Sequence, residues 1–85
     1  KILYVEAMAD YVIIHLEDGK HIIHSTMKGI DKKLNQNNFL RVHRSYIVNM
    51  NKIDTVENNG ILLKDKHVPI GASYKSEFMN QLRIL

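Results

Sequence analysis

The chain has 85 residues, enough for one small domain, and 45% of them are apolar, so it can form a core and is not disordered by composition. It has no cysteine, which excludes disulfide bonds and cysteine-ligated zinc or iron–sulfur centres. Its net charge of +3 is mild, and no apolar run approaches the roughly 20 residues of a membrane-spanning helix. We expect a cytoplasmic protein with no membrane partner.

The first third of the chain predicts a strand followed by a hairpin. The segment 2–7 has the composition of a strand, and strands at 11–16 and 20–25 flank Asp18-Gly19, a strong two-residue turn signal. A tight turn at this dipeptide would pair Leu16 with His21. One face of the hairpin would then point toward the core with Val12, Ile14, Leu16 and Ile23. The other face, which includes Ile13 and Ile22, would lie mostly in solvent.

The rest of the chain predicts short elements separated by turns. They are a helix at 26–34 capped by Ser25 or Thr26, a strand at 39–43, a helical turn at 46–49 capped by Ser45, a hairpin of 53–58 and 60–65 joined at Asn59-Gly60, a strand at 66–70 that lies at a sheet edge or ends at Pro69, and a helix at 73–85 capped by Ser73. Many short strands without strand–helix alternation indicate an all-β or β-dominated domain.

Basic residues concentrate in the middle of the chain. No acid lies between Asp31 and Asp54, whereas this interval holds five cations: Lys32, Lys33, Arg41, Arg44 and Lys52. Such segregation gives one face a positive potential that attracts polyanions, of which nucleic acids are one class.

Metal and catalytic sites are poorly supported. His15 and His24 should share one face of the hairpin, but the nearest further candidates are Glu17 and Lys20, and a lysine repels a cation. No nucleophile motif or phosphate-binding glycine loop is present. We therefore expect no metal, no cofactor and no enzymatic activity.

The segment 39–53, FLRVHRSYIVNMNKI, resembles the signature of the LytTR family of DNA-binding domains. In that signature an aromatic residue, Arg, His, a variable polar residue, Ser or Thr, an aromatic residue, two aliphatic residues and Asn follow in order. The flanks ILYVEAMADYVIIHLEDGK and VPIGASYKSEFMNQL resemble the first hairpin region and the last strand and helix of the family. The matching positions are Phe39, Arg41, His43, Arg44, Ser45, Tyr46, Ile47, Val48 and Asn49, with Ile53 as a later aliphatic residue.

The resemblance implies an elongated stack of small antiparallel sheets with short helices, which reads double-stranded DNA through loops. It implies the output domain of a two-component response regulator that binds direct repeats in promoters, with self-association driven by an upstream receiver domain. The strand that precedes ILYVEA in the family is not found. We therefore expect residues 1–85 to be a LytTR-type domain that lacks its first strand and belongs to a longer protein.

The resemblance places DNA contacts in three segments. One is the loop 7–11, with Asp10 at a base-reading position; one follows FLRVH; and one precedes the last helix, with Lys75 at the other base-reading position. The implied contact residues are Asp10, His43, Arg44, Ser45, Ser73, Lys75 and Ser76.

Chemistry leaves several of these roles open. Lys75 suits guanine O6 or N7, and Arg44 suits a phosphate or a narrow minor groove. Asp10 either accepts from cytosine N4 or caps its own turn. His43 is either bonded to backbone or a phosphate ligand, and Arg41 is expected in a structural ion pair.

A different class of function is also compatible with a basic β-sandwich: a protein-interaction module that binds acidic peptides by strand addition. RNA is a weaker alternative, because the aromatic and glycine pattern of an RNA-recognition motif is missing. Salt dependence separates these classes, because DNA binding weakens steeply as salt rises.

Overall fold

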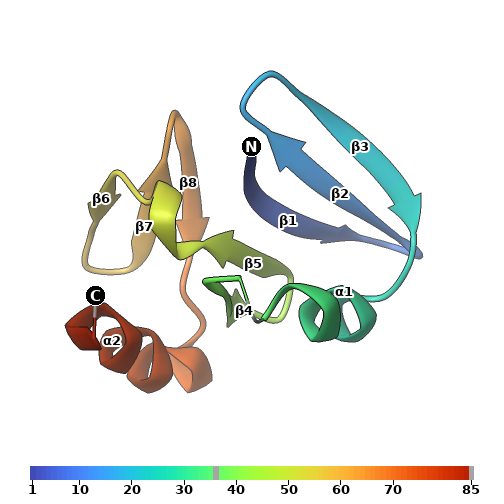
Figure 1. Cartoon of the computed structure of the whole chain (residues 1–85). Helices are drawn as coiled ribbons and strands as arrows, with labels where there is room; N and C mark the ends of the chain where they lie inside the picture. The colour runs from blue at the N-terminus through green and yellow to red at the C-terminus, as the bar shows by residue number, and fades with distance from the viewer. Residues whose placement is uncertain (36, 85) are drawn as a thin grey trace.

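The computed structural model describes residues 1–35 and 37–84, which form eight strands, two α-helices and two 3-10 turns (Figure 1). In chain order these are β1 (Ile2–Met8), β2 (Tyr11–Leu16), β3 (Gly19–His24), α1 (Met27–Leu34), β4 (Phe39–His43), β5 (Tyr46–Asn49), η1 (Met50–Lys52), β6 (Thr55–Val56), β7 (Gly60–Leu63), β8 (Lys66–Pro69), η2 (Ala72–Tyr74) and α2 (Lys75–Ile84).

The strands form two sheets, a five-stranded one in the order β3-β2-β1-β5-β4 and a three-stranded one in the order β6-β7-β8. Every pairing is antiparallel. Figure 1 shows α1 below the larger sheet and α2 below the smaller one. The prediction of a β-dominated stack of small antiparallel sheets with short helices is confirmed.

The five-stranded sheet buries both faces around its central strands. Because side chains alternate along a strand, Ile47 of β5 points to the face covered by α1, whereas Val48 points to the other face. The core under α1 is formed by Val5, Val12, Met27, Ile30 and Ile47. The second core joins the two sheets and α2 through Leu3, Tyr4, Val42, Val48, Met50, Ile61, Leu63, Val68 and Phe78.

The segment 46–49 is a strand, so the predicted helical turn capped by Ser45 is wrong. It lies between β1 and β4, and its two central residues, Ile47 and Val48, are fully buried on opposite faces. A strand buried on both faces loses the alternation of apolar and polar residues and cannot be told from a helical turn by its pattern.

The first hairpin forms where predicted, but its register differs by two residues. Leu16 pairs with Gly19 instead of His21, so the turn residues are Glu17 and Asp18. A shift of two preserves which side chains share a face. Burial nevertheless differs from expectation, because Ile13 is only 4% exposed, whereas Ile23 on the edge strand is 37% exposed.

The second hairpin forms, but its register also differs by two residues: the Glu57 N–H donates to the Gly60 carbonyl at 2.8 Å, so the turn residues are Asn58 and Asn59 and Gly60 begins β7. β8 is an edge strand, as Pro69 predicted. Gly60 is required for close approach, because a Cβ there would lie 2.8 Å from the backbone carbonyl oxygen of Val68 in β8. The last helix begins later than predicted: η2 follows Gly71 without a side-chain cap, and α2 starts at Lys75. Ser73 is therefore not its cap, and the predicted end at residue 85 lies outside the described residues.

Candidate nucleic-acid interface

Two of the predicted contact loops lie side by side because β1 pairs with β5. Glu6 pairs with Tyr46, and the Ala7 N–H donates to the Ser45 carbonyl at 2.9 Å. The turn 9–10 at the end of β1 therefore adjoins the turn 44–45 at the start of β5. Ala9 has a φ of 55°, a left-handed conformation that sharply reverses the chain before Asp10.

The third segment reaches the same end of the sheet through β4. The Gly71 N–H donates to the Val42 carbonyl at 2.7 Å, and a Cβ on Gly71 would lie 3.7 Å from the His43 Cα. η2 therefore starts beside the end of β4 and delivers Ser73, Lys75 and Ser76 there. We call this end of the five-stranded sheet, with the turns 9–10 and 44–45 and the start of η2, the turn end.

The predicted contact residues at the turn end are largely accessible. Asp10, Arg44, Ser73, Lys75 and Ser76 are exposed, whereas His43 and Ser45 are half-buried. Across residues 1–35 and 37–84, no hydrogen bond or ion pair engages the side chains of Asp10, Arg44 or Lys75. The capping bond considered for Asp10 is thus not formed, and its carboxylate faces solvent.

The turn 44–45 is braced by the strand that precedes it. Arg41 Nη2 donates to the Arg44 carbonyl at 2.6 Å, and Arg41 Nε donates to the His43 carbonyl at 3.4 Å. The Ser45 N–H donates to His43 Nδ1 at 3.1 Å, which leaves the proton of a neutral ring on Nε2. The expectation of an ion pair for Arg41 is wrong, because its partners are backbone carbonyls.

A polar cluster that sequence reasoning missed supports the turn from the neighbouring strands. Glu6 Oε1 lies 3.0 Å from His15 Nε2, and the Tyr46 hydroxyl donates to Glu6 Oε2 at 3.5 Å. The Tyr4 ring stacks on His15 with centroids 4.1 Å apart. Burial, and then the charge of Glu6, raise the pKa of Tyr4 to about 12 and also raise the pKa of Tyr46, so both phenols stay neutral.

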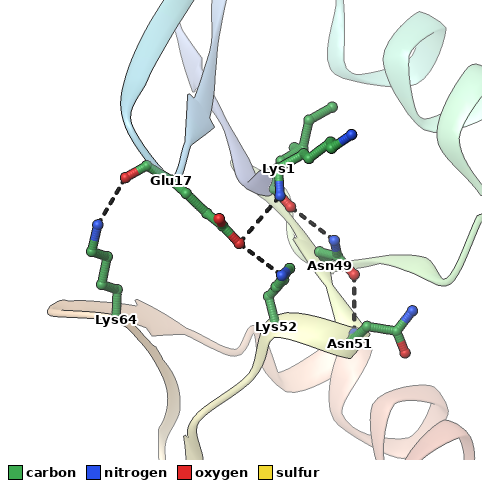
Figure 2. A network of polar contacts seen from close by, with 7 residues as sticks. Lys1, Glu17, Asn49, Asn51, Lys52 and Lys64 are labelled. Atoms are coloured by element: carbon green, nitrogen blue, oxygen red, sulfur yellow. Dashed lines mark hydrogen bonds and ion pairs between the residues drawn. The ribbon is translucent and has the colours of Figure 1, made fainter.

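Lys52 belongs to the opposite end of the molecule and not to the turn end. Figure 2 shows its Nζ on the Glu17 carboxylate, at 2.7 Å, while Lys64 Nζ donates to the Glu17 carbonyl at 2.8 Å. Chiefly because of the hydrogen bond from Lys52, the pKa of Glu17 falls to about 2. Asn49 also lies here, with its Nδ2 donating to the Ile2 carbonyl at 2.8 Å. Lys52 and Asn49 belong to the acid-free stretch between Asp31 and Asp54, but they stabilise the fold at this end and do not lie at the turn end.

The two histidines considered as metal ligands, His15 and His24, lie far apart on the first hairpin. His15 pairs with Lys20 and His24 with Tyr11, four positions apart on the hairpin, or about 13 Å at strand spacing. Within the described ranges, no three His, Cys, Asp or Glu side chains gather as metal ligands. No helix in these ranges is long and apolar enough to cross a membrane.

Comparison with known proteins gives a family for residues 1–83 of the chain. The LytTr DNA-binding domain family model matches residues 1–83. The sensory transduction protein LytT of Bacillus anthracis is 34% identical over 90 residues, covering 88% of this chain and 37% of the relative. The CO-responsive transcriptional regulator RcoM of Rhodospirillum rubrum is 30% identical, covering 98% of this chain and 38% of the relative. This chain therefore spans well under half the length of these relatives.

A solved structure supports the same assignment at the level of the fold. The LytTr DNA-binding domain of a methyl-accepting/DNA response regulator from Bacillus cereus superposes with a TM-score of 0.88 at 26% identity, over 96% of this chain and 81% of that chain. The family model, the signature in β4 and β5, and the sheet arrangement all agree. The chain belongs to the LytTR family of DNA-binding domains.

Proposed function

We propose that the turn end binds double-stranded DNA through its three loop segments and reads bases with Lys75 and Asp10. The observation that carries this proposal is the convergence of segments about 30 residues apart in sequence, 9–10, 44–45 and 72–76, at one end of one sheet. They present exposed cationic and hydroxyl groups there, which suit phosphate oxygens and base edges.

Each residue has a role that follows from its surroundings. Arg44 and the hydroxyls of Ser45, Ser73 and Ser76 would contact phosphates and fix the register of the domain on the duplex. His43, bonded to backbone through Nδ1, keeps its Nε2 side for a neutral donor contact. Asp10 would accept from cytosine N4 between these phosphate contacts.

The role of this domain within a longer protein is inferred from its relatives. We propose that the domain is the output part of a two-component transcriptional regulator, with a receiver domain upstream whose activation drives pairing of subunits on direct repeats in promoters. The names of the relatives, a sensory transduction protein and a response regulator, support this proposal. A cytoplasmic location also remains a prediction.

Salt titration with two duplexes tests the DNA-binding proposal. One duplex is selected by the domain from a random pool, and the other has random sequence. Lys75→Ala should cost about 1–3 kcal/mol on the selected duplex and much less on the random one, as loss of a base contact does. Arg44→Ala should weaken both duplexes alike and lower the salt slope by roughly one unit.

Arg83→Gln is the matched control, because Arg83 is exposed and about 12 Å along α2 from Lys75. It should leave both affinities nearly unchanged. A wild-type domain that binds acidic peptides but shows no salt-dependent binding to any duplex would refute the proposal in favour of a protein-interaction module.

A further inference from the structure

A fourth segment reaches the turn end, although the sequence signature does not include it. Tyr11 pairs with His24 at the end of β3, and their rings meet edge to face with centroids 5.2 Å apart. The chain then passes through Ser25 and Thr26 into the first turn of α1. We call residues 24–28 the β3–α1 junction.

The junction and the turn 9–10 form the two walls of a hollow of about 380 Å³. Asp10 lines one wall, and His24 and Ser25 line the other. Thr26 also lines the hollow, but its hydroxyl already accepts from the Gly29 N–H at 3.0 Å. His24 and Ser25 thus offer polar side chains to a ligand from the lining of the hollow, and Lys28 follows them in the first turn of α1, outside the lining.

The charge of the junction suits an anion. His24 and Lys28 are exposed, and the first turn of α1 contains no acid. Within the described chain, neither side chain takes part in an ion pair. Asp10 across the hollow is the one carboxylate among the residues that line it.

The order of the strands places the junction on the other side of Asp10 from Arg44. Because the sheet runs β3-β2-β1-β5-β4, the turn between β1 and β2 lies between the end of β3 and the start of β5. Three strand spacings separate β3 from β5, or about 14 Å. A major groove is about 12 Å wide, so groups at these two strands can reach the phosphates on its two walls while the turn between them faces the bases.

We propose that the β3–α1 junction is a fourth DNA-contacting segment, in which Lys28 and His24 bind the sugar–phosphate backbone on the groove wall opposite Arg44. This inference rests on the proposed function. It gives Asp10 a base-reading position with a phosphate contact on each side, which offsets the repulsion of its carboxylate by the duplex.

Lys28→Gln tests this inference, with Lys20→Gln as its control. Lys20 is an exposed lysine at the other end of β3, about 13 Å from His24 and beyond the roughly 8 Å Debye length at physiological salt. Lys28→Gln should lower the salt slope by about one unit on selected and random duplexes alike, and Lys20→Gln should leave it unchanged. Unchanged thermal unfolding of both variants would show that the fold is retained.

Replacing single phosphates by methylphosphonates in the selected duplex gives a second readout. One substitution should weaken wild type several-fold yet leave Lys28→Gln unaffected, and it should lie on the strand across the groove from the phosphate that is coupled to Arg44. If Lys28→Gln and Lys20→Gln behave alike while Arg44→Ala still lowers the slope, this inference is refuted and the proposed function stands. A wild-type domain without salt-dependent duplex binding refutes both.

Discussion

Arg41→Lys should separate the bracing of the turn 44–45 from the charge that attracts DNA. The guanidinium of Arg41 donates to two carbonyls, those of Arg44 at 2.6 Å and His43 at 3.4 Å. Lysine keeps the charge, but its ammonium cannot reproduce the planar fork that reaches both. Only the shorter bond has a length typical of a strong hydrogen bond, and it is exposed, so its loss should cost about 1 kcal/mol.

A loss of about 1 kcal/mol in the free energy of unfolding corresponds to a measurable fall in Tm. At about 2.1 cal/mol/K per residue, unfolding 85 residues has an entropy of about 180 cal/mol/K, so a loss of 1 kcal/mol lowers Tm by about 6 °C. Differential scanning calorimetry measures this shift. Because the charge count is preserved, DNA affinity should fall by up to about fivefold on every duplex, with an unchanged salt slope.

Arg44→Lys is the matched control, since the Arg44 side chain makes no bracing bond among the described residues. It should retain the wild-type Tm. If Arg41→Lys also melts like wild type and binds DNA with wild-type affinity, the two carbonyl contacts do not position the turn, and the reasoning fails.

Three other changes test separate parts of the structure. Asp10→Asn should switch the preferred base at one operator position in a binding-site selection; a uniform rise in random-DNA affinity that salt abolishes would instead show that Asp10 only repels phosphate. Gly60→Ala should cost about 1–3 kcal/mol in urea unfolding, because its Cβ would lie 2.8 Å from the backbone carbonyl oxygen of Val68, whereas Gly19→Ala, in open space, should cost far less. The pKa of Glu17 is lowered from 4.5 to about 2, so its contribution to stability is present above pH 4.5 and is lost as pH falls through 2; Lys52→Gln should flatten that acid dependence in thermal melts, and identical profiles would contradict the pairing.

Local signals in the sequence were enough for the strand 39–43, for the existence of both hairpins and for the edge position of β8, but not for the registers of the hairpins, which both differ by two residues. Each depends on neighbours in the chain: alternation along one strand, a turn dipeptide, or a proline that cannot donate a ladder bond. The signature in 39–49 was likewise enough for the family, because it combines core positions of β4 and β5 with the turn between them.

Other features were decided only by contacts between segments far apart in the chain. Whether 46–49 forms a strand depends on β1 lying on one side of it and β4 on the other. Lys52 and Arg44 look alike in the acid-free stretch, yet the fold pairs Lys52 with Glu17 and leaves Arg44 in solvent. The sequence gives the position of each charge along the chain, but only the order of the strands determines which charges share a face, because neighbours in a sheet need not be neighbours in sequence.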